Sequence, residues 1–500
     1  MAANYFPPLE TFVERSKLGN LVPVWREVLA DMETPVSAFR KIANGRENSF
    51  LLESVEGGER VARYSFLGSD PFMVLRTKGE TGTIATPNGV EAITLRRGDR
   101  DPLHILKELL GQYTYVPTAE LPRFVGGAVG MIGYDTVRFF EELPVLAKDD
   151  LNLDDCIFLF TDTILVFDHV KHKMLAVCNA RITEGQTATK AYEIAKNKIQ
   201  QLLDRLQNPY VAPAPVARQS VEPFAPNRTE EDYKAAVLKA KDYIYAGDTF
   251  QAQIGQRLSK KLNADPFDVY RALRSINPSP YMFYLDFGDT KLVGTSPEVL
   301  VSEQERKVTM RPIAGSRHGR GATIEADNAI AEDLLSDKKE RAEHIMLVDL
   351  ARNDIGRIAE YGSVSVDELM VVEKYSHVMH IVSEVTGRLR PELDQFDVLR
   401  ASFPAGTLTG APKVRTMEII EELEPTRRGH YGGGIGYFSY NGDMDSAITI
   451  RTALVKDGIV YAQAAGGVVA DSVPEYEYQE TLAKMRAVTR AVEWAEAGLD

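Results

Sequence analysis

Hydrophobic side chains recur at helical spacing in several long stretches of the chain. Between residues 187 and 206, apolar positions return every three or four residues, which is the period of one buried helix face. Start signals and apolar runs predict further helices over residues 230–246, 337–353 and 473–497. The last of these opens with Ser472 and then Glu475 three residues later, which is the spacing of a capping box.

Short apolar runs between these helices have the pattern of strands joined as hairpins. The dipeptide Asp457-Gly458 divides the run from 445 to 463, and such a pair favours a tight hairpin turn. Turn residues also follow the runs 50–55 (at Gly57-Gly58) and 281–287 (at Gly288-Asp289). Strand groups interleaved with long helices predict an α+β fold. We expect two facing antiparallel β-sheets with surrounding helices, because two such sheets can bury each other's apolar faces.

Two glycine-rich segments, residues 126–135 and 433–441, resemble each other, and each is followed by β-rich hairpins. An internal duplication of one sheet unit would explain the likeness. Glycine-rich hairpins also resemble one another through composition alone, so both interpretations stay open at this point.

A proline-rich, polar stretch divides the chain into unequal parts. Five prolines fall between residues 208 and 227, a composition that favours an extended connector. We therefore expect an N-terminal regulatory or structural domain over residues 1–207, a linker over 208–227, and a C-terminal domain over 228–500. With 500 residues the chain is too long for one hydrophobic core.

Composition and charge narrow the class of protein. The chain is 44% hydrophobic and 26% charged, with a net charge of −14 and no dense basic run, so a nucleic-acid surface is disfavoured. The two cysteines, Cys156 and Cys178, lie in apolar runs and are expected to be buried, reduced thiols. The sequence has neither the features of a signal peptide nor a membrane-spanning apolar stretch, so we expect a cytoplasmic protein without membrane contact.

The block from Gly406 to Lys413 is the strongest local signal of chemistry. Its glycines can present backbone N–H groups, and a helical pattern follows it, so the block favours binding of an anion. The spacing differs from that of a nucleotide-binding phosphate loop, which leaves a small carboxylate or a hydroxyl as the expected ligand. A second cluster, Gly466-Gly467, could present N–H groups in the same way. Arg451 could add a bidentate carboxylate contact, although an arginine on an edge strand is also common.

Carboxylates on two predicted helices could bind a divalent cation. Glu477, Glu480 and Lys484 share one helix face, and Glu343 stands at the edge of an apolar helix where an unpartnered carboxylate is costly. Oxygen ligands of this kind suit Mg²⁺. Spacing alone favours the alternative of a surface ion pair between Glu480 and Lys484. His380 lies in an apolar, β-rich run, where it is either a general acid or base or a satisfied core histidine.

Four of these segments occur in an order that is specific. Residues 343–354, 375–380, 406–413 and 471–480 together resemble the chorismate-utilising enzymes, and within them the large subunits of anthranilate synthases. The resemblance covers essentially the whole chain. It implies that ammonia displaces the ring hydroxyl of chorismate by attack at a neighbouring carbon, and that pyruvate is then eliminated to leave anthranilate. It also makes the C-terminal domain the catalytic, chorismate-binding one.

The resemblance also implies roles for individual residues. Glu298 and His380 match positions beside the reacting ring and suit proton transfer to the departing hydroxyl, without deciding between the two. Ala465 is a departure, because many relatives have glycine there and a methyl group could shift the backbone slightly. The implied sets are Glu298, His380, Gln251 and Thr407 for catalysis; Gly406, Tyr431, Arg451, Ala465, Gly466, Gly467 and Lys484 for the substrate; and Glu343 and Glu480, supported by Glu477, for Mg²⁺.

Two positions distinguish the reactions of this family. Gln251 stands where the water-using members have a lysine base, so ammonia is the expected nucleophile. Ala314 stands where the aminodeoxychorismate-forming members typically have a nucleophilic lysine, and a methyl group cannot form a covalent adduct.

The resemblance further implies regulation and a partner. Glu53, Ser54, Pro280, Tyr281 and Met282 match the tryptophan feedback site of the family, where Glu53 could accept an ammonium group. These residues are equally compatible with a turn and core strands. Neither cysteine has the surroundings of a glutaminase nucleophile, so we expect a separate glutamine amidotransferase subunit in a hetero-oligomer.

Two alternatives remain from the sequence. One is the related enzyme that makes aminodeoxychorismate. The other is a non-catalytic amino-acid sensor, which the presence of Glu343, His380 and Glu480 disfavours because a sensor needs no metal pair.

Overall fold

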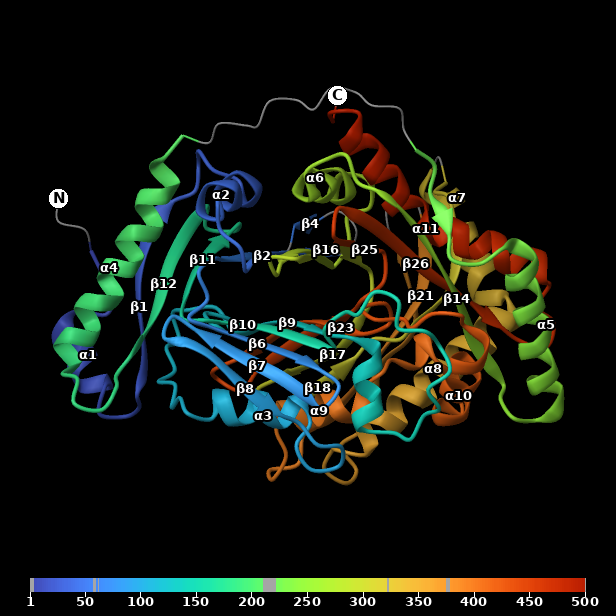
Figure 1. The fold of residues 1–500 in the computed structure, drawn as a ribbon, viewed down its shortest axis with the longest axis horizontal. Helices are drawn as coiled ribbons and strands as arrows, with labels where there is room; N and C mark the ends of the chain where they lie inside the picture. Colours follow the sequence, from blue (N-terminus) through green and yellow to red (C-terminus); the bar gives the residue numbers. More distant parts are fainter. Residues whose placement is uncertain are drawn as a thin grey trace.

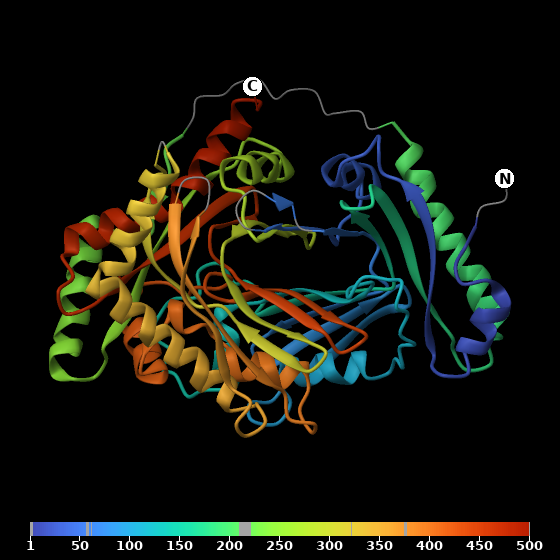
Figure 2. The same cartoon turned by 180° about the vertical axis from the view of Figure 1, so that it is seen from behind.

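Two large antiparallel sheets face each other at the centre of the molecule, with helices outside both (Figures 1 and 2). The computed structural model describes residues 4–56, 60–61, 63–209, 222–321, 323–374 and 378–499. The predicted α+β fold with two facing antiparallel sheets is confirmed. Gly57 and Gly58, like most of the proline-rich stretch, lie outside the described residues.

Each sheet has twelve strands within the described residues. Sheet I contains, in spatial order, β1 (Leu21–Leu29), β12 (Lys173–Arg181), β11 (Thr163–Asp168), β5 (Tyr64–Gly68), β2 (Ser49–Glu53), β15 (Tyr281–Asp286), β16 (Thr290–Ser296), β25 (Thr452–Lys456), β26 (Ile459–Val468), β14 (Gln251–Lys261) and β13 (Ala225–Pro226), with β22 (Gly410–Ala411) also paired to β14. Sheet II contains β19 (Ile313–His318), β21 (Val378–Arg388), β18 (Lys307–Met310), β17 (Val299–Gln304), β24 (Met444–Ile448), β23 (Gly434–Ser439), β9 (Gly127–Ile132), β10 (Cys156–Thr161), β6 (Met73–Lys78), β7 (Thr81–Thr86) and β8 (Gly89–Thr94), with β20 (Ser365–Lys374) paired to β21. A separate pair joins β3 (Val55–Glu56) to β4 (Arg60–Val61).

Each half of the chain supplies one contiguous half of each sheet. The halves join at two central strand pairs, β2 with β15 in sheet I and β9 with β23 in sheet II. Outward from the first pair, β5, β11, β12 and β1 on one side follow the same order of connections as β16, β25, β26 and β14 on the other. This recurrence is what a duplicated sheet unit predicts.

The two glycine-rich segments meet at the centre of sheet II. Gly130 of β9 pairs directly with Gly436 of β23. A Cβ atom at Gly130 would lie 1.9 Å from the carbonyl oxygen of Ile157, and one at Gly436 would lie 2.0 Å from that of Asp445. Both positions therefore require glycine, which gives the likeness of the two segments a common steric cause.

The layers of the molecule follow from which strand faces are apolar. One buried cluster, with Phe50, Met131 and Leu454 among its members, fills the space between the two sheets. A second lies between sheet I and its helices, and a third between sheet II and the helices on its outer face. The result is a helix–sheet–sheet–helix arrangement (Figure 1).

The helices lie close to the predicted positions. The helix over 230–246 is found with those bounds, and the other three differ from prediction by one to three residues at their ends. The α-helices are α1 (Leu9–Arg15), α2 (Pro35–Ile42), α3 (Pro102–Leu110), α4 (Ala188–Gln207), α5 (Glu230–Ala246), α6 (Pro266–Ile276), α7 (Ile324–Ser336), α8 (Lys338–Gly356), α9 (Gln395–Ser402), α10 (Lys413–Leu423) and α11 (Pro474–Glu496), with 3₁₀ turns η1 (Tyr134–Phe139) and η2 (Gly406–Leu408).

The predicted capping box at the start of α11 was wrong. Val473 is the N-cap residue, and no side chain caps this helix. The Ser472 hydroxyl instead donates to a carboxylate oxygen of Glu477 at 2.7 Å and accepts from the backbone N–H of Val469 at 3.0 Å. Ser472 therefore fixes a buried carboxylate rather than the helix end.

Several smaller expectations are confirmed. Asp457 and Gly458 both have positive φ angles, as the tight turn between β25 and β26 requires. Cys156 and Cys178 are buried free thiols, and burial raises the pKa of each to about 12. Within the part of the chain that the structure describes, no helix is both long and apolar enough to span a membrane.

The domain division at residues 207 and 228 stays a prediction. Strands from both sides of that division share both sheets, so the two parts are joined by continuous hydrogen bonding through β2–β15 and β9–β23.

Candidate active site

The predicted catalytic, substrate-binding and metal-binding residues lie mainly on α8, β14, β26, α11 and the loop that contains η2. Strand β14 connects them, because it pairs with β26 along one edge and with the end of this loop, β22, along the other. Residues that are far apart in sequence are thereby brought to one end of sheet I.

Gln251 joins three of these elements. It is the first residue of β14, and its side-chain amide donates to a carboxylate oxygen of Glu343 on α8 at 3.2 Å. Across the strand pair, a Cβ atom at Gly467 would lie only 2.7 Å from the same amide nitrogen. The glycine therefore leaves room for Gln251 to reach Glu343, and its backbone lies next to the amide.

The carboxylate of Glu477 on α11 lies against Gly466, which precedes Gly467 on β26. A Cβ atom at Gly466 would be 2.9 Å from a carboxylate oxygen of Glu477, and that oxygen is buried without a hydrogen-bond partner among the described residues. Burial raises the pKa of Glu477, and Glu480 raises it further. The ion pair between Glu480 and Lys484 forms at 2.7 Å, which is the alternative that the spacing favoured.

These carboxylates fit a hard divalent cation. Their donors are all carboxylate oxygens, and one buried oxygen of Glu477 lacks a partner among the described residues. Lys339, close to the start of α8, is near enough to lower the pKa of Glu477, so the helix that carries Glu343 lies beside the start of α11. No group of three or more metal-binding side chains converges within the described part of the chain. A site with few protein ligands is typical of Mg²⁺, which keeps several waters and is completed by its substrate.

Cationic groups face the same region from sheet I and α11. Lys484 donates to the backbone carbonyl of Ala465 at 2.9 Å, and Arg451 donates to the carbonyl of Lys484 at 2.6 Å. Arg451 has a φ of 52°, a strained conformation for an arginine that turns it out of regular strand geometry. Burial lowers its pKa, and the nearby Tyr431 and Glu480 oppose that change. Tyr431, Arg451, Lys484 and the backbone of Ala465 are thus neighbours, and their contact with a substrate stays a prediction.

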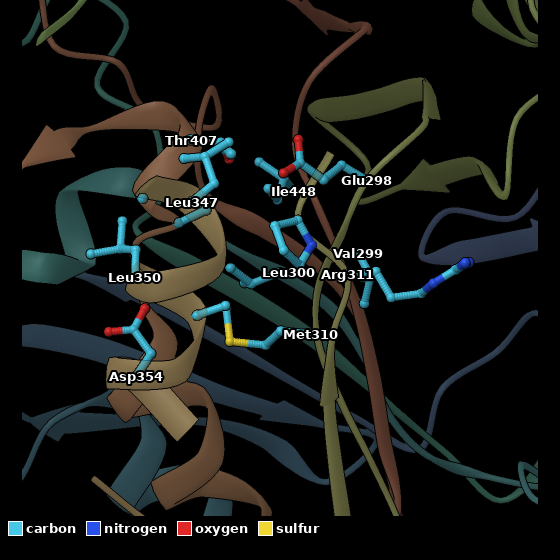
Figure 3. A pocket seen from close by; sticks show the side chains of 14 residues that line it. Glu298, Val299, Leu300, Met310, Arg311, Leu347, Leu350, Asp354, Thr407 and Ile448 are labelled. Atoms are coloured by element: carbon cyan, nitrogen blue, oxygen red, sulfur yellow. The ribbon is translucent and has the colours of Figure 1, made fainter. Parts of the chain in front are cut away.

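A pocket opens between α8 and the start of β17 (Figure 3). Glu298 and Thr407 lie at one end of it and Asp354 at the other. Its wall is otherwise mostly apolar, with Leu300, Met310, Leu347 and Leu350 among the lining residues. The Thr407 hydroxyl is buried and lies next to the Glu298 carboxyl, whose pKa it lowers.

Glu298 is the most perturbed acid of the site. Burial raises the pKa of its carboxyl to about 8, while the nearby Thr407 hydroxyl and Lys484 oppose the rise. The carboxyl is therefore largely protonated near neutral pH. A buried carboxylic acid in this form can donate a proton to a leaving group.

The loop that contains Thr407 is packed tightly on α8. A Cβ atom at Gly406 would lie 1.8 Å from a methyl carbon of Leu350, so a larger residue there would force Leu350 to move. At the end of the loop, Lys413 donates to Asp354 at 2.9 Å, and both side chains are largely buried. Lys413 thus binds a helix residue rather than a ligand.

Two other expected positions lie on sheet II. His380 of β21 is half-buried, with its Nδ1 atom 2.8 Å from the Ser316 hydroxyl, and it is not among the described residues that line the pocket. Ala314 of β19 is buried opposite Ile381 and offers only a methyl group.

The residues expected to bind tryptophan lie at the junction of the two halves. Glu53 of β2 pairs with Met282 of β15, which places Ser54 and Pro280 at the same end of that strand pair. The Glu53 carboxylate already accepts from Tyr270 and from Arg274 (3.0 Å), so an incoming ammonium group would share it with a guanidinium. Tyr281 donates to Asp445 at 2.9 Å.

One buried ion pair next to the site could not be predicted from the sequence pattern. Arg428 and Glu424 form an ion pair that touches both β14 and the Thr407 loop. Their spacing of four resembles a helix-surface pair, but α10 ends before Glu424, so helical periodicity could not place them.

The chain is similar to characterised proteins along most of its length. A sequence model described as chorismate binding enzyme matches residues 48–490. Anthranilate synthase component 1 of Acetivibrio thermocellus is 46% identical over 499 residues, which cover 98% of this chain and 99% of that one. The protein of the same name from Pseudomonas aeruginosa is 48% identical over 487 residues, covering 96% and 97%.

Solved structures give the same result. The crystal structure of anthranilate synthase component I from Streptococcus pneumoniae matches with a TM-score of 0.75 and 42% identity, over 86% of this chain and 92% of that one. The menaquinone-specific isochorismate synthase MenF of Escherichia coli matches with a TM-score of 0.69 at 16% identity, over 97% and 98%. At that identity the second match concerns the fold alone.

Proposed function

The chain belongs to the chorismate-binding enzyme family, among its anthranilate synthase component 1 members, and we propose that it converts chorismate and ammonia to anthranilate and pyruvate. The name anthranilate synthase implies a role for this reaction in tryptophan biosynthesis. The observation that carries the proposal is the place of Gln251, whose amide lies between Glu343 and the backbone of Gly467. An amide cannot act as a base at neutral pH, so water is not activated there and ammonia is the nucleophile.

Substrate binding uses the cation that precedes β25, the backbone of β26 and the cation of α11. Arg451, Lys484 and the N–H groups of Gly466 and Gly467 suit a carboxylate, and Tyr431 forms a wall beside them. Thr407 supplies a hydroxyl from the opposite loop. Chorismate has two carboxylates, and the second lies with Glu343, Glu477 and Glu480, where it requires a cation.

Mg²⁺ is the cation that these residues fit. Glu343 and Glu480 would hold it, with Glu477 in support, and when bound it neutralises the carboxylates and fixes the ring carboxylate of the substrate. Glu477 is itself oriented by Ser472, which is the reason that Ser472 does not cap α11.

Glu298 donates the proton that the departing hydroxyl needs. Its carboxyl is largely protonated near neutral pH, and it lies beside the buried Thr407 hydroxyl. The hydroxyl leaves as water while ammonia forms its bond to a neighbouring ring carbon. Loss of a ring proton and of the enolpyruvyl group as pyruvate then gives the aromatic product. His380, held by Ser316, is less well placed for the first proton transfer, because it is not part of the pocket wall around Glu298.

The proposal includes a partner and an inhibitor. Component 1 enzymes are named as one part of a pair, and a glutamine amidotransferase subunit that supplies ammonia is the matching second part. Tryptophan binding at the junction of β2 and β15, near Ser54 and Pro280, would place the feedback site between the two halves of the chain. A cytoplasmic location agrees with two buried, reduced thiols.

An assay of the purified chain tests the function. Chorismate, Mg²⁺ and an ammonium salt should give fluorescent anthranilate and an equal amount of pyruvate. A non-fluorescent product that retains the enolpyruvyl group would indicate the aminodeoxychorismate reaction instead. Chorismate that is bound but not consumed would indicate a sensor.

A further inference from the structure

A fully buried ion pair joins the two segments that carry Thr407 and Gln251. The side chains of Arg428 and Glu424 are only 1% and 4% exposed. The guanidinium contacts both carboxylate oxygens, with an Nε–Oε2 distance of 3.0 Å and an Nη2–Oε1 distance of 2.6 Å. This geometry is bidentate and therefore fixes the orientation of the arginine.

The remaining hydrogen bonds of the pair all go to the backbone of the site. Arg428 donates to the carbonyl of Leu408, next to Thr407, at 2.5 Å and to the carbonyl of Gln253, two residues from Gln251, at 2.8 Å. Glu424 accepts from the N–H of Gly255 at 2.8 Å. A Cβ atom at Gly255 would lie 2.9 Å from that same oxygen, so the strand approaches the carboxylate closely.

Aromatic rings complete the surroundings of the cation. The guanidinium carbon lies 4.7 Å from the ring centre of Tyr134 and 5.7 Å from that of Tyr431. Tyr134 comes from the N-terminal half of the chain, and Tyr431 is an expected substrate contact. Arg428 therefore touches the loop, the strand and one wall of the site at once.

Stability alone does not account for such a pair. Removing two charges from water costs free energy that their mutual attraction often fails to recover, and apolar residues of similar size can be equally stable at such positions. What apolar residues cannot do is hold three backbone groups of two different segments at fixed separations.

We propose that Arg428 and Glu424 are positioning residues that set the distance and orientation between the Thr407 loop and strand β14. Without touching the substrate, they make Thr407 on one side and Gln251 on the other face the same ligand. This inference rests on the proposed function, because it concerns the geometry of that reaction. Small displacements of reacting groups lower rates strongly, so loss of the pair should reduce kcat about 100-fold.

Two variants test the proposal with the whole chain. Arg428→Lys keeps the positive charge but cannot make the bidentate contact with Glu424. The double variant Arg428→Met with Glu424→Met removes both charges and keeps side chains of similar size. In each folded variant, with ammonium as nitrogen donor, kcat should fall about 100-fold while KM for chorismate changes less than threefold. Should Arg428→Lys not fold, Glu424→Gln gives the same test, since it keeps the acceptor for the Gly255 N–H.

A double-mutant cycle with Thr407 separates positioning from general stabilisation. Thr407→Ala should cost much activity in the wild-type background and little in the Arg428→Lys background, because the hydroxyl is already displaced there. If Arg428 has only a structural role, the fold-losses in activity of Thr407→Ala and Arg428→Lys should multiply in the double variant.

The pair between Lys260 and Glu496 is a matched control. It is equally buried, with side-chain exposures of 0% and 6% and an N–O distance of 2.7 Å. Lys260 lies on the same strand nine residues from Gln251, roughly 30 Å along it. Lys260→Met with Glu496→Met should leave kcat within twofold and combine with Thr407→Ala without coupling.

The outcomes distinguish the inference from the proposed function. A wild-type chain that makes no anthranilate would overturn the function itself. An active wild type, with folded Arg428 or Glu424 variants that keep kcat within twofold or show no coupling to Thr407, would overturn the positioning role.

Discussion

Replacement of Glu298 by glutamine removes the acidic proton from the pocket and leaves the side chain nearly unchanged in size. The carboxyl is buried, and its pKa is raised from 4.5 to about 8. At pH 7.5 a carboxyl with pKa 8 is about three-quarters protonated, whereas one with pKa 4.5 is about 0.1% protonated. Burial therefore supplies nearly all of the acid form that the reaction needs.

The activity of the variant follows from that difference. Glu298→Gln should lower kcat by about 100- to 10,000-fold, which is the usual contribution of a positioned acid. The wild-type rate should fall about tenfold per pH unit above pH 8, because the ionised form cannot donate. Anthranilate fluorescence with saturating ammonium and Mg²⁺, recorded between pH 6 and 9.5, measures both effects.

Glu298→Gln should make the folded protein more stable at pH 8, although it lowers the activity. The folded pKa lies above the unfolded value, so the folded state holds the proton more tightly and its stability falls as pH rises from about 4.5 to 8. The loss amounts to about 4 kcal/mol at pH 8. Glutamine does not ionise, so the variant should resist urea better than the wild type at pH 8, and the gap should vanish near pH 4.5.

A second buried glutamate provides the control. Burial raises the pKa of Glu303 to about 7, and it accepts from the N–H of Arg306 at 2.7 Å, but it does not line the pocket. Glu303→Gln should keep kcat within about twofold. The reasoning fails if Glu298→Gln retains more than a tenth of the wild-type kcat, or if it is no more stable than the wild type at pH 8.

Four further outcomes are expected. A chelator should abolish chorismate consumption, and Glu480→Gln should raise the Mg²⁺ concentration for half-maximal rate at least about tenfold in a titration; unchanged metal dependence would contradict the assignment. Lys413→Met should lower the urea-unfolding free energy by about 3 kcal/mol because it leaves Asp354 buried without its cation, and adding Asp354→Leu should restore most of it. Ser54→Phe should keep turnover but lose inhibition by tryptophan, and full inhibition of the variant would refute that site. Ammonium alone should support turnover and glutamine alone should not; glutamine-dependent product from the purified chain would refute a separate amidotransferase.

Local patterns predicted helices and turns well where a residue type strongly prefers one structural position, such as a helix cap or a tight turn. The helix over 230–246 has a threonine before it and a glycine after it, and the structure uses both as caps. The Asp457-Gly458 turn likewise permits little else than a tight hairpin. The motifs lie far apart in sequence, and the structure brings Gln251, Glu343 and Gly467 together at one end of sheet I, while their roles stay predictions.

Features that depend on distant residues were not predictable. Ser472 has the spacing of a cap, but it is used by Glu477, since a buried carboxylate needs the hydroxyl more than an accessible helix end does. The pair of Glu424 and Arg428 lies in an irregular segment, and its partners are backbone groups up to 175 residues away. Neither hydrophobic period nor local propensity carries such information.

The central strand pairs have a consequence for how the chain is made. Strand β9 is complete roughly 300 residues before its partner β23 is synthesised, and β2 is complete roughly 230 residues before β15. At a synthesis rate of about 5–20 residues per second, β9 has an unpaired edge for roughly 15 to 60 s. Exposed strand edges recruit other chains, so the growing polypeptide should depend on chaperones during this interval. The C-terminal half produced alone would expose the partner edges of β15 and β23 and is therefore expected to aggregate.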